Sequence, residues 1–215
     1  MTPRNPVITQ GSIDQFLDQL AGAQPTPGGG SAAAIMGAMG AALVSMVCNV
    51  SFGKKGCESA EPQLRAILER SETLRRRLAG MVAEDIAAFD ALMAAYKLPK
   101  ASQEEKARRS QIIQASLRRA TEVPLECARA CAEVVELAQR VTAQGYRHVI
   151  SDAGVGVAAA DAALRSAALN VFINAPALED KDFAQRATDE VERLSRACAA
   201  DSAATYAAVR AKLEG

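Results

Sequence analysis

The sequence predicts an all-α protein, built as one domain that spans residues 1–215 and forms a bundle of long helices. Hydrophobic residues make up 49% of the chain and aromatic residues only 4%, with alanine abundant, a composition typical of packed helices. Proline and glycine divide the chain into long segments, and none shows the sustained alternation of a strand. A length of 215 residues allows one sizeable core and is short for two ordinary domains.

We expect six helices, whose limits follow from this proline and glycine punctuation. They cover residues 12–21, 31–52, 62–96, 102–144, 151–174 and 181–212. Several of them approach or exceed thirty residues, and no internal repeat is visible, so a bundle is favoured over a solenoid.

The second helix begins at a junction that reads Pro-Thr-Pro-Gly-Gly-Gly-Ser over residues 25–31. Three glycines leave the backbone free to lie against a ligand, and we expect Ser31 to cap the helix that follows. The helix N-terminus would suit an anionic or carbonyl-bearing ligand. The junction lacks the Gly-Lys-Ser/Thr ending of a phosphate loop and is no dinucleotide fingerprint. The alternative is a flexible loop that leads into a buried helix.

Residues 32–50 carry no charge, so a membrane span has to be weighed against a buried core helix. Small residues interrupt the run throughout, which would make membrane insertion marginal. The same composition suits a central helix that neighbouring helices or a second subunit approach closely. We therefore expect a buried helix in an oligomer.

The third and fourth helices each contain one residue that conflicts with its surroundings. Asp85 falls at the centre of an apolar stripe, where a carboxylate must pair with a cation, be protonated or meet a ligand. Pro124 lies inside the fourth helix, and we expect it to kink that helix or break it in two near Thr121 and Glu122.

The fifth helix carries a stripe of small and polar residues opposite an apolar face, which predicts a polar groove or a close helix contact. The stripe comprises Asp152, Gly156, Ala159, Ala163, Ser166, Asn170 and Asn174. Asp152 has a simpler alternative as a cap or dipole partner of the helix. Asn170 and Asn174, like Asn49 in the second helix, have an alternative as hydrogen-bonding partners between helices.

The charge and the cysteine content indicate which kinds of partner and which cellular compartment to expect. Lys plus Arg equal Asp plus Glu at 25 each, which argues against nucleic acid and leaves small molecules or proteins as partners. Five cysteines and no secretory leader over residues 1–11 indicate free thiols in the cytoplasm. Cys127 and Cys131 lie one turn apart, but the single histidine, His148, gives them no metal-binding companion, and we expect no metal site.

A set of motifs in this order resembles the family of formiminotetrahydrofolate cyclodeaminases and methenyltetrahydrofolate cyclohydrolases, with the stand-alone bacterial cyclohydrolases most similar. The motifs are Phe16-Leu17, residues 25–31, 37–43, Met46-Val47 with Asn49, 53–55, Glu84-Asp85 with Phe89-Asp90, 96–100, 120–124, 151–155 and 168–174. Together they span nearly the whole chain.

This resemblance implies an all-helical homodimer that binds tetrahydrofolate derivatives in a cleft near the subunit interface. It implies one of two reactions: hydrolysis of 5,10-methenyltetrahydrofolate to 10-formyltetrahydrofolate, or cyclisation of 5-formiminotetrahydrofolate with loss of ammonia. We expect hydrolysis, without the formiminotransferase half of the bifunctional animal enzymes. The rival from another class is a helical protein that binds folate or a partner without catalysis.

The chemistry of hydrolysis suggests roles for the polar residues. Asp85 or Asp152 would orient water and stabilise the substrate cation, and Lys100 or Lys54 would donate hydrogen bonds to the developing oxygen or the glutamate tail. The predicted substrate contacts are Pro27, Gly28, Gly29, Gly30, Ser31, Asn49, Lys54, Asn170 and Asn174. No cofactor beyond the tetrahydrofolate substrate is expected.

Overall fold

The computed structural model describes residues 11–214, and this part of the chain is entirely helical apart from its connections. The helices are α1 (Ile13–Leu20), α2 (Gly29–Ser51), α3 (Glu61–Tyr96), α4 (Gln103–Gln144), α5 (Ile150–Asn174) and α6 (Lys181–Glu214). Short 3₁₀ turns occupy Glu58–Ala60, Arg147–Val149 and Ala175–Ala177. No strand occurs in residues 11–214, so the all-α prediction is confirmed there. The expectation about a secretory leader concerns residues that lie, except for Gly11, outside the described part.

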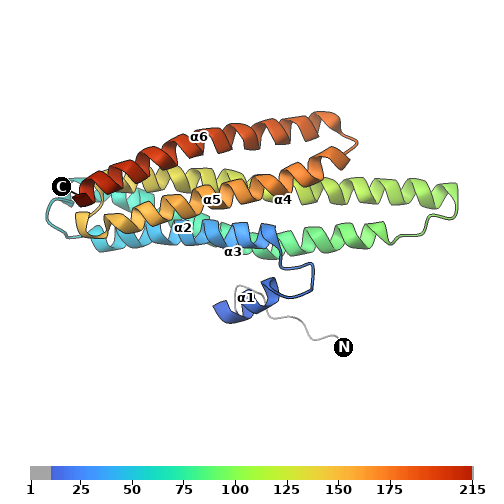
Figure 1. Ribbon diagram of the computed structural model, residues 1–215, viewed down its shortest axis with the longest axis horizontal. Helices are drawn as coiled ribbons and strands as arrows, with labels where there is room; N and C mark the ends of the chain where they lie inside the picture. The colour runs from blue at the N-terminus through green and yellow to red at the C-terminus, as the bar shows by residue number, and fades with distance from the viewer. Residues whose placement is uncertain (1–10, 215) are drawn as a thin grey trace.

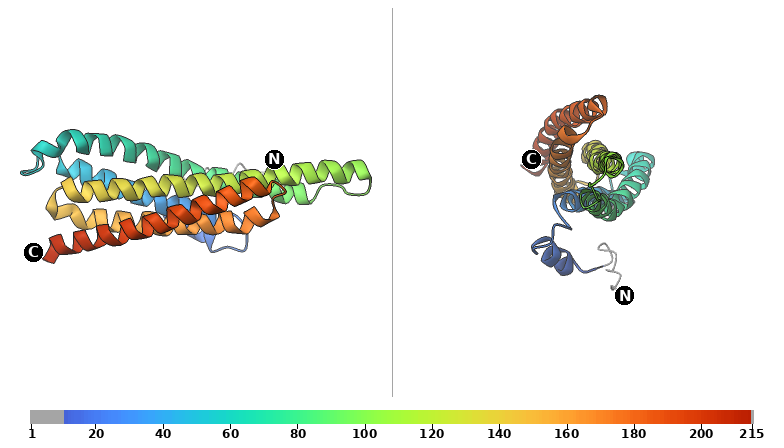
Figure 2. Two further views of the ribbon diagram at one scale, coloured as in Figure 1. Left: turned by 90° about the horizontal axis from the view of Figure 1, so that it is seen from above. Right: turned by 90° about the vertical axis from the view of Figure 1, so that its right-hand side faces the viewer.

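Helices α2 to α6 run lengthwise beside one another, and α1 stands apart from them (Figures 1 and 2). The hairpin of α3 and α4 extends beyond the other helices at one end, and the C-terminus lies at the opposite end. Helix α1 begins with a capping box between Ser12 and Gln15 but buries none of its residues.

Helix α2 is the centre of the bundle because its small residues let other helices come close. A Cβ on Gly40 would lie 2.9 Å from the carbonyl oxygen of Gly156 in α5, and one on Gly37 would lie 2.7 Å from the Cys131 sulfur in α4. The side chains of Val44 and Val47 are fully buried. By length and hydropathy α2 and residues 147–177 could each cross a membrane, but 56% and 50% of their most apolar windows are buried inside the protein.

Helix α4 corrects one expectation from the sequence. It runs without interruption from Gln103 to Gln144, so the prediction that Pro124 breaks it in two was wrong. The hydroxyl of Thr121 donates to the carbonyl of Leu117, one turn earlier, at 2.8 Å. Buried contacts on both sides of Pro124, including Val123 and Leu125, hold the helix together across the missing backbone donor.

A second correction concerns the start of α2. The helix begins at Gly29 with Gly28 as its N-cap, and no side chain of its own segment caps it. Ser31 therefore lies inside the first turn, where it is fully buried, and the prediction that it caps the helix was wrong. Its hydroxyl is directed toward Asp85 of α3 instead.

Candidate active site

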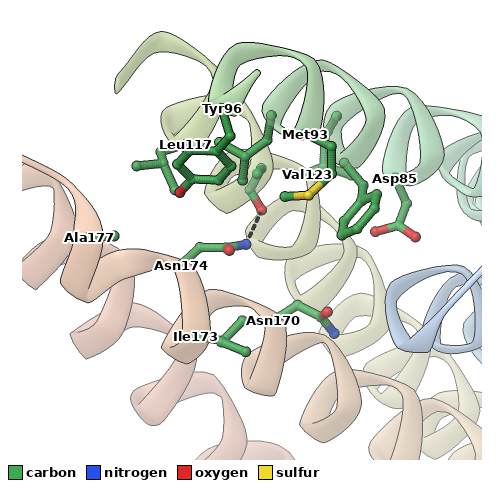
Figure 3. Close-up of a pocket in the computed structure, with 13 residues that line it drawn as sticks. Asp85, Met93, Tyr96, Leu117, Val123, Asn170, Ile173, Asn174 and Ala177 are labelled. Carbon is green, nitrogen blue, oxygen red and sulfur yellow. Dashed lines mark hydrogen bonds between the residues drawn. The ribbon is translucent and has the colours of Figure 1, made fainter. Parts of the chain in front are cut away.

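A pocket of about 370 Å³ lies between α3, α4 and the C-terminal end of α5 (Figure 3). Its walls are mostly apolar, and its polar side chains are Asp85, Asn170 and Asn174 together with the exposed Tyr96. The remaining lining residues are Ala88, Phe89, Leu92, Met93, Leu117, Ala120, Val123, Ile173 and Ala177. This volume and lining are typical of a site for a small organic ligand.

Asp85 is positioned by the N-terminus of α2. The Ser31 hydroxyl donates to Oδ2 of Asp85 at 2.8 Å, and the backbone N–H of Ser31 also lowers the pKa of this carboxyl group. A Cβ on Gly30 would lie only 2.1 Å from Oδ1 of Asp85, so the carboxylate occupies space that only glycine leaves free. Asp85 thus accepts a hydrogen bond from the first turn of a helix that lies 54 residues earlier in the chain.

The protonation of Asp85 reflects two opposing effects. Burial raises the pKa of this carboxyl group above its usual value, and the two hydrogen bonds from Ser31 partly offset that rise. No basic side chain of residues 11–214 lies within salt-bridge distance of Asp85. The cation-paired alternative is therefore not adopted, and the group is suited to accept a proton more readily than an ordinary aspartate or to face a cationic ligand.

Two amides from α5 face the same space as Asp85 (Figure 3). Nδ2 of Asn174 donates to the carbonyl of Ala120 in α4 at 2.8 Å, and Nδ2 of Asn170 donates to the carbonyl of Ser166 at 3.0 Å. Asn170 also approaches the glycine junction, because a Cβ on Gly29 would lie 4.0 Å from its Nδ2. These bonds direct the nitrogens toward the helix backbone, so the amide oxygens are available as acceptors, beside the second N–H of each amide.

The arrangement combines flat apolar walls with three acceptors, one of them a carboxylate. Phe89, Met93 and Tyr96 come from successive turns of α3 on the same side as Asp85. Such a pocket suits a planar heterocycle whose edge carries N–H donors and whose charge is positive or becomes so.

The structure brings six of the predicted site residues together and separates the others. Asp85, Gly29, Gly30, Ser31, Asn170 and Asn174 surround the pocket or its α2 boundary. Gly28 is the N-cap of α2, and Pro27 is buried directly before it.

The remaining predicted residues lie elsewhere in the same subunit. Asn49 is twenty positions after Gly29 on one helix, which places it about 30 Å away. Asp152 is separated from Asn170 by about 27 Å along α5. The exposed Lys54 follows α2 at the Asn49 end, where its ammonium lies 5.8 Å from the centre of the Tyr146 ring. Lys100 is exposed in the loop between α3 and α4.

Asp152 caps nothing through its side chain, but it occupies the first turn of α5, as its alternative as a dipole partner predicts. Asn49 is exposed, so it does not bond between the helices of one subunit.

The sequence analysis gave no role in the site to the pocket walls from α4, namely Leu117, Ala120 and Val123. Ala120 and Val123 belong to the motif at residues 120–124, but as side chains all three resemble any buried apolar residue. The pocket residues from α3 could be found from the sequence, because they belong to the apolar stripe that contains Asp85.

The five cysteines are all buried and free, and burial raises the pKa of Cys48 to about 12. In the described residues no group of three or more His, Cys, Asp and Glu side chains is arranged to hold a metal ion.

Comparison with known proteins places this geometry in a family. The chain is 54% identical over 94% of its length to a methenyltetrahydrofolate cyclohydrolase of Methylorubrum extorquens, and the match covers 97% of that protein. It is 28% identical to the formimidoyltransferase-cyclodeaminase of Rattus norvegicus over 96% of its own length, which is 38% of the rat protein.

The crystal structure of a formiminotetrahydrofolate cyclodeaminase from Thermotoga maritima superposes with a TM-score of 0.81 at 30% identity, covering 97% of this chain and 98% of that one. Residues 12–193 match the formiminotransferase-cyclodeaminase family, and the chain therefore belongs to that family.

Proposed function

We propose that the protein is a methenyltetrahydrofolate cyclohydrolase, which hydrolyses 5,10-methenyltetrahydrofolate to 10-formyltetrahydrofolate. The observation that carries this proposal is the half-buried carboxylate of Asp85, which lines an apolar pocket beside Asn170 and Asn174. The substrate is a flat cation, delocalised over N5, the bridging carbon and N10. An apolar slot that ends in a single unpaired carboxylate suits it. The identity of 54% to the M. extorquens cyclohydrolase supports the same reaction.

In the proposed mechanism Asp85 is the general base. Its carboxylate takes a proton from the water whose oxygen attacks the bridging carbon, and the cation becomes a neutral tetrahedral carbinol. The bond between that carbon and N5 then breaks while protonated Asp85 returns the proton to N5. The remaining hydroxyl proton leaves to solvent, so that one proton is released for each 10-formyl product. Burial raises the pKa of Asp85, which makes its carboxylate a stronger base for the first transfer.

The binding role falls to the acceptors and the glycine junction. The amide oxygens of Asn170 and Asn174 would accept from the N–H edge of the pterin ring. Residues 27–30 would let the backbone approach that ring, with Ser31 acting through Asp85. Lys100, in the α3–α4 loop, would reach the developing oxygen or the glutamate tail.

The distant residues Asn49, Lys54 and Asp152 can serve the same pocket only from another subunit, so the proposal includes a homodimer. Helices α2 and α5 both present exposed apolar side chains, with Met39 at 56% and Leu169 at 67% exposure. A second copy packed across these two helices would cover them. We further propose one domain over the whole chain, a cytoplasmic location, and no metal or cofactor beyond the tetrahydrofolate substrate.

The cyclodeaminase reaction is the second candidate, because the T. maritima structure with that activity covers nearly all of this chain. Both reactions pass through a tetrahedral carbon between N5 and N10. The decisive assay mixes the protein with 5,10-methenyltetrahydrofolate and follows the loss of its near-ultraviolet absorbance against the uncatalysed rate. A parallel assay with 5-formiminotetrahydrofolate follows the formation of that chromophore and of ammonia.

Accelerated loss alone would establish the cyclohydrolase, and accelerated formation with ammonia would establish the cyclodeaminase. Saturable folate binding without turnover would leave a folate-binding protein, and no binding at all would favour a helical interaction protein.

The variant Asp85→Asn tests the mechanism, since an amide cannot accept the proton. We expect kcat to fall by about 10²- to 10⁴-fold while folding is preserved. Because folding raises the pKa of Asp85, the ionised carboxylate destabilises the folded state at pH values above that pKa. Asparagine has no ionised form and does not destabilise the folded state in this way. Thermal unfolding should therefore occur at the wild-type temperature or above it. Turnover near the wild-type rate with unchanged folate affinity would remove Asp85 from the mechanism.

A further inference from the structure

The backbone carbonyl of Ala120 connects Pro124 with Asn174, because the proline leaves this carbonyl without its helical donor and the asparagine donates to it. In an uninterrupted α-helix the N–H of residue 124 would donate to the carbonyl of Ala120, but proline has no N–H. The Nδ2 group of Asn174, from α5, donates to this carbonyl at 2.8 Å (Figure 3). The proline therefore leaves an acceptor free on α4, and a side chain of the neighbouring helix occupies it.

This contact fixes which end of the Asn174 amide enters the pocket. A carbonyl oxygen can only accept, so the amide nitrogen must face Ala120. The amide oxygen is consequently directed away from α4, and Asn174 and Ala120 both line the pocket. With its usual helical donor the Ala120 carbonyl would accept two hydrogen bonds, as a carbonyl with two lone pairs can, and it would hold the Asn174 amide less firmly.

We propose that Pro124 is a positioning residue for substrate recognition, because it exposes the Ala120 carbonyl that locks the Asn174 amide with its oxygen toward the ligand. This inference rests on the proposed function, in which the ligand edge carries N–H donors. A locked acceptor selects for a ring edge rich in donors and against one rich in acceptors.

Asn170 provides the matched control. Its nitrogen is anchored to the carbonyl of Ser166 on its own helix, so its orientation does not depend on Pro124. A cycle of substitutions at Pro124, Asn174 and Asn170 separates an effect that passes through Asn174 from any general disturbance of the pocket. The separation is needed because Pro124 also borders a small cavity of about 10 Å³ that Asp85 lines.

The test is Pro124→Ala, which restores the N–H at this position. We expect KM for 5,10-methenyltetrahydrofolate to rise about 3- to 10-fold, the effect of one neutral hydrogen bond, with kcat within about two-fold of wild type. In the Asn174→Ala background the same substitution should leave KM unchanged. In the Asn170→Ala background it should raise KM by its full factor. Pro124→Val, which also restores the N–H and fills more of the buried volume, serves if the alanine variant does not fold.

A readout without substrate tests the positioning itself. Hydrogen exchange of the Asn174 side-chain amide, followed by NMR, should be slow in the wild type and faster in the proline variants. An unchanged KM in Pro124→Ala, an equal rise in the Asn174→Ala background, or unchanged amide exchange would each overturn the proposal. If the wild type neither binds nor converts the folate, the proposed function fails, whereas the exchange measurement still decides whether Pro124 holds Asn174.

Discussion

Replacing Gly30 by alanine probes the contact between the α2 N-terminus and Asp85. The added Cβ would lie 2.1 Å from Oδ1, 2.6 Å from Cγ and 2.9 Å from Oδ2 of Asp85, whereas ordinary contact begins near 3.4 Å. The carboxylate must therefore move away by about 1.3 Å, the difference between 2.1 Å and the 3.4 Å of ordinary contact. Its 2.8 Å hydrogen bond from the Ser31 hydroxyl cannot survive such a shift.

The expected loss of activity follows from this displacement. A reacting group misplaced by about 1 Å costs on the order of 10²-fold in rate, or about 2.7 kcal/mol of transition-state stabilisation. We expect kcat/KM of Gly30→Ala to fall by about 10²-fold, measured by the loss of methenyltetrahydrofolate absorbance. Circular dichroism and thermal unfolding would show whether the helices remain intact.

Gly29→Ala is the matched control, because it lies in the same helical turn and its Cβ would meet nothing nearer than 4.0 Å. Its kcat/KM should fall less than that of Gly30→Ala, because the added methyl group does not meet Asp85 and affects only the proposed approach of the backbone to the ring. The reasoning would be refuted if Gly30→Ala kept kcat/KM within about two-fold of wild type, or if both glycine variants lost the same activity.

Three further substitutions test the electrostatics of the site and the packing of the bundle. In Ser31→Ala the pKa of Asp85 should rise further, because the hydroxyl bond that lowers it is lost. A base acts when ionised, so the acid limb of the kcat/KM profile against pH should move to higher pH, and an unmoved limb would contradict the assignment. Gly40→Ala places a Cβ 2.9 Å from the Gly156 carbonyl oxygen and should lower the free energy of unfolding in urea by about 1–3 kcal/mol. Gly80→Ala, with no atom within 4 Å of its Cβ, should raise the free energy of unfolding by about 0.5–1 kcal/mol, and a loss there would show that space does not decide the sign.

Much of the fold was predictable because local signals coincide with the observed helix ends. Residues 62–96 and 102–144 were expected and Glu61–Tyr96 and Gln103–Gln144 are observed, since Pro62 and the Ser102 capping box act locally. The role of Ser31 at the start of α2 was misjudged because its hydroxyl bonds to a carboxylate of a different helix instead of capping its own. No spacing rule relates Ser31 to a carboxylate 54 residues later.

Residues of the candidate site could be predicted where a polar residue interrupts, or follows, the helical pattern of its segment. Asp85 interrupts an apolar stripe, and Asn170 with Asn174 lies on a polar one, so the helical periodicity of the sequence is enough to identify both. The link between Asn174 and Ala120 was not predictable, because it depends on how α4 and α5 pack. The distances of Asn49 and Asp152 from Asp85 depend on helix directions, which the sequence does not give. Their separations of about 30 Å from Gly29 and about 27 Å from Asn170, in contrast, follow from the rise of a single helix.

The tie between Asp85 and the first turn of α2 also has a consequence for folding. Neither helix alone supplies both the half-buried carboxylate and the Ser31 donor that stabilises it. A chain in which α2 and α3 have formed but not yet docked would carry an Asp85 that titrates like an ordinary aspartate. The raised pKa of Asp85 is thus present only once α2 and α3 have docked. The titration of Asp85 during folding would therefore report when these two helices come together, without any added probe.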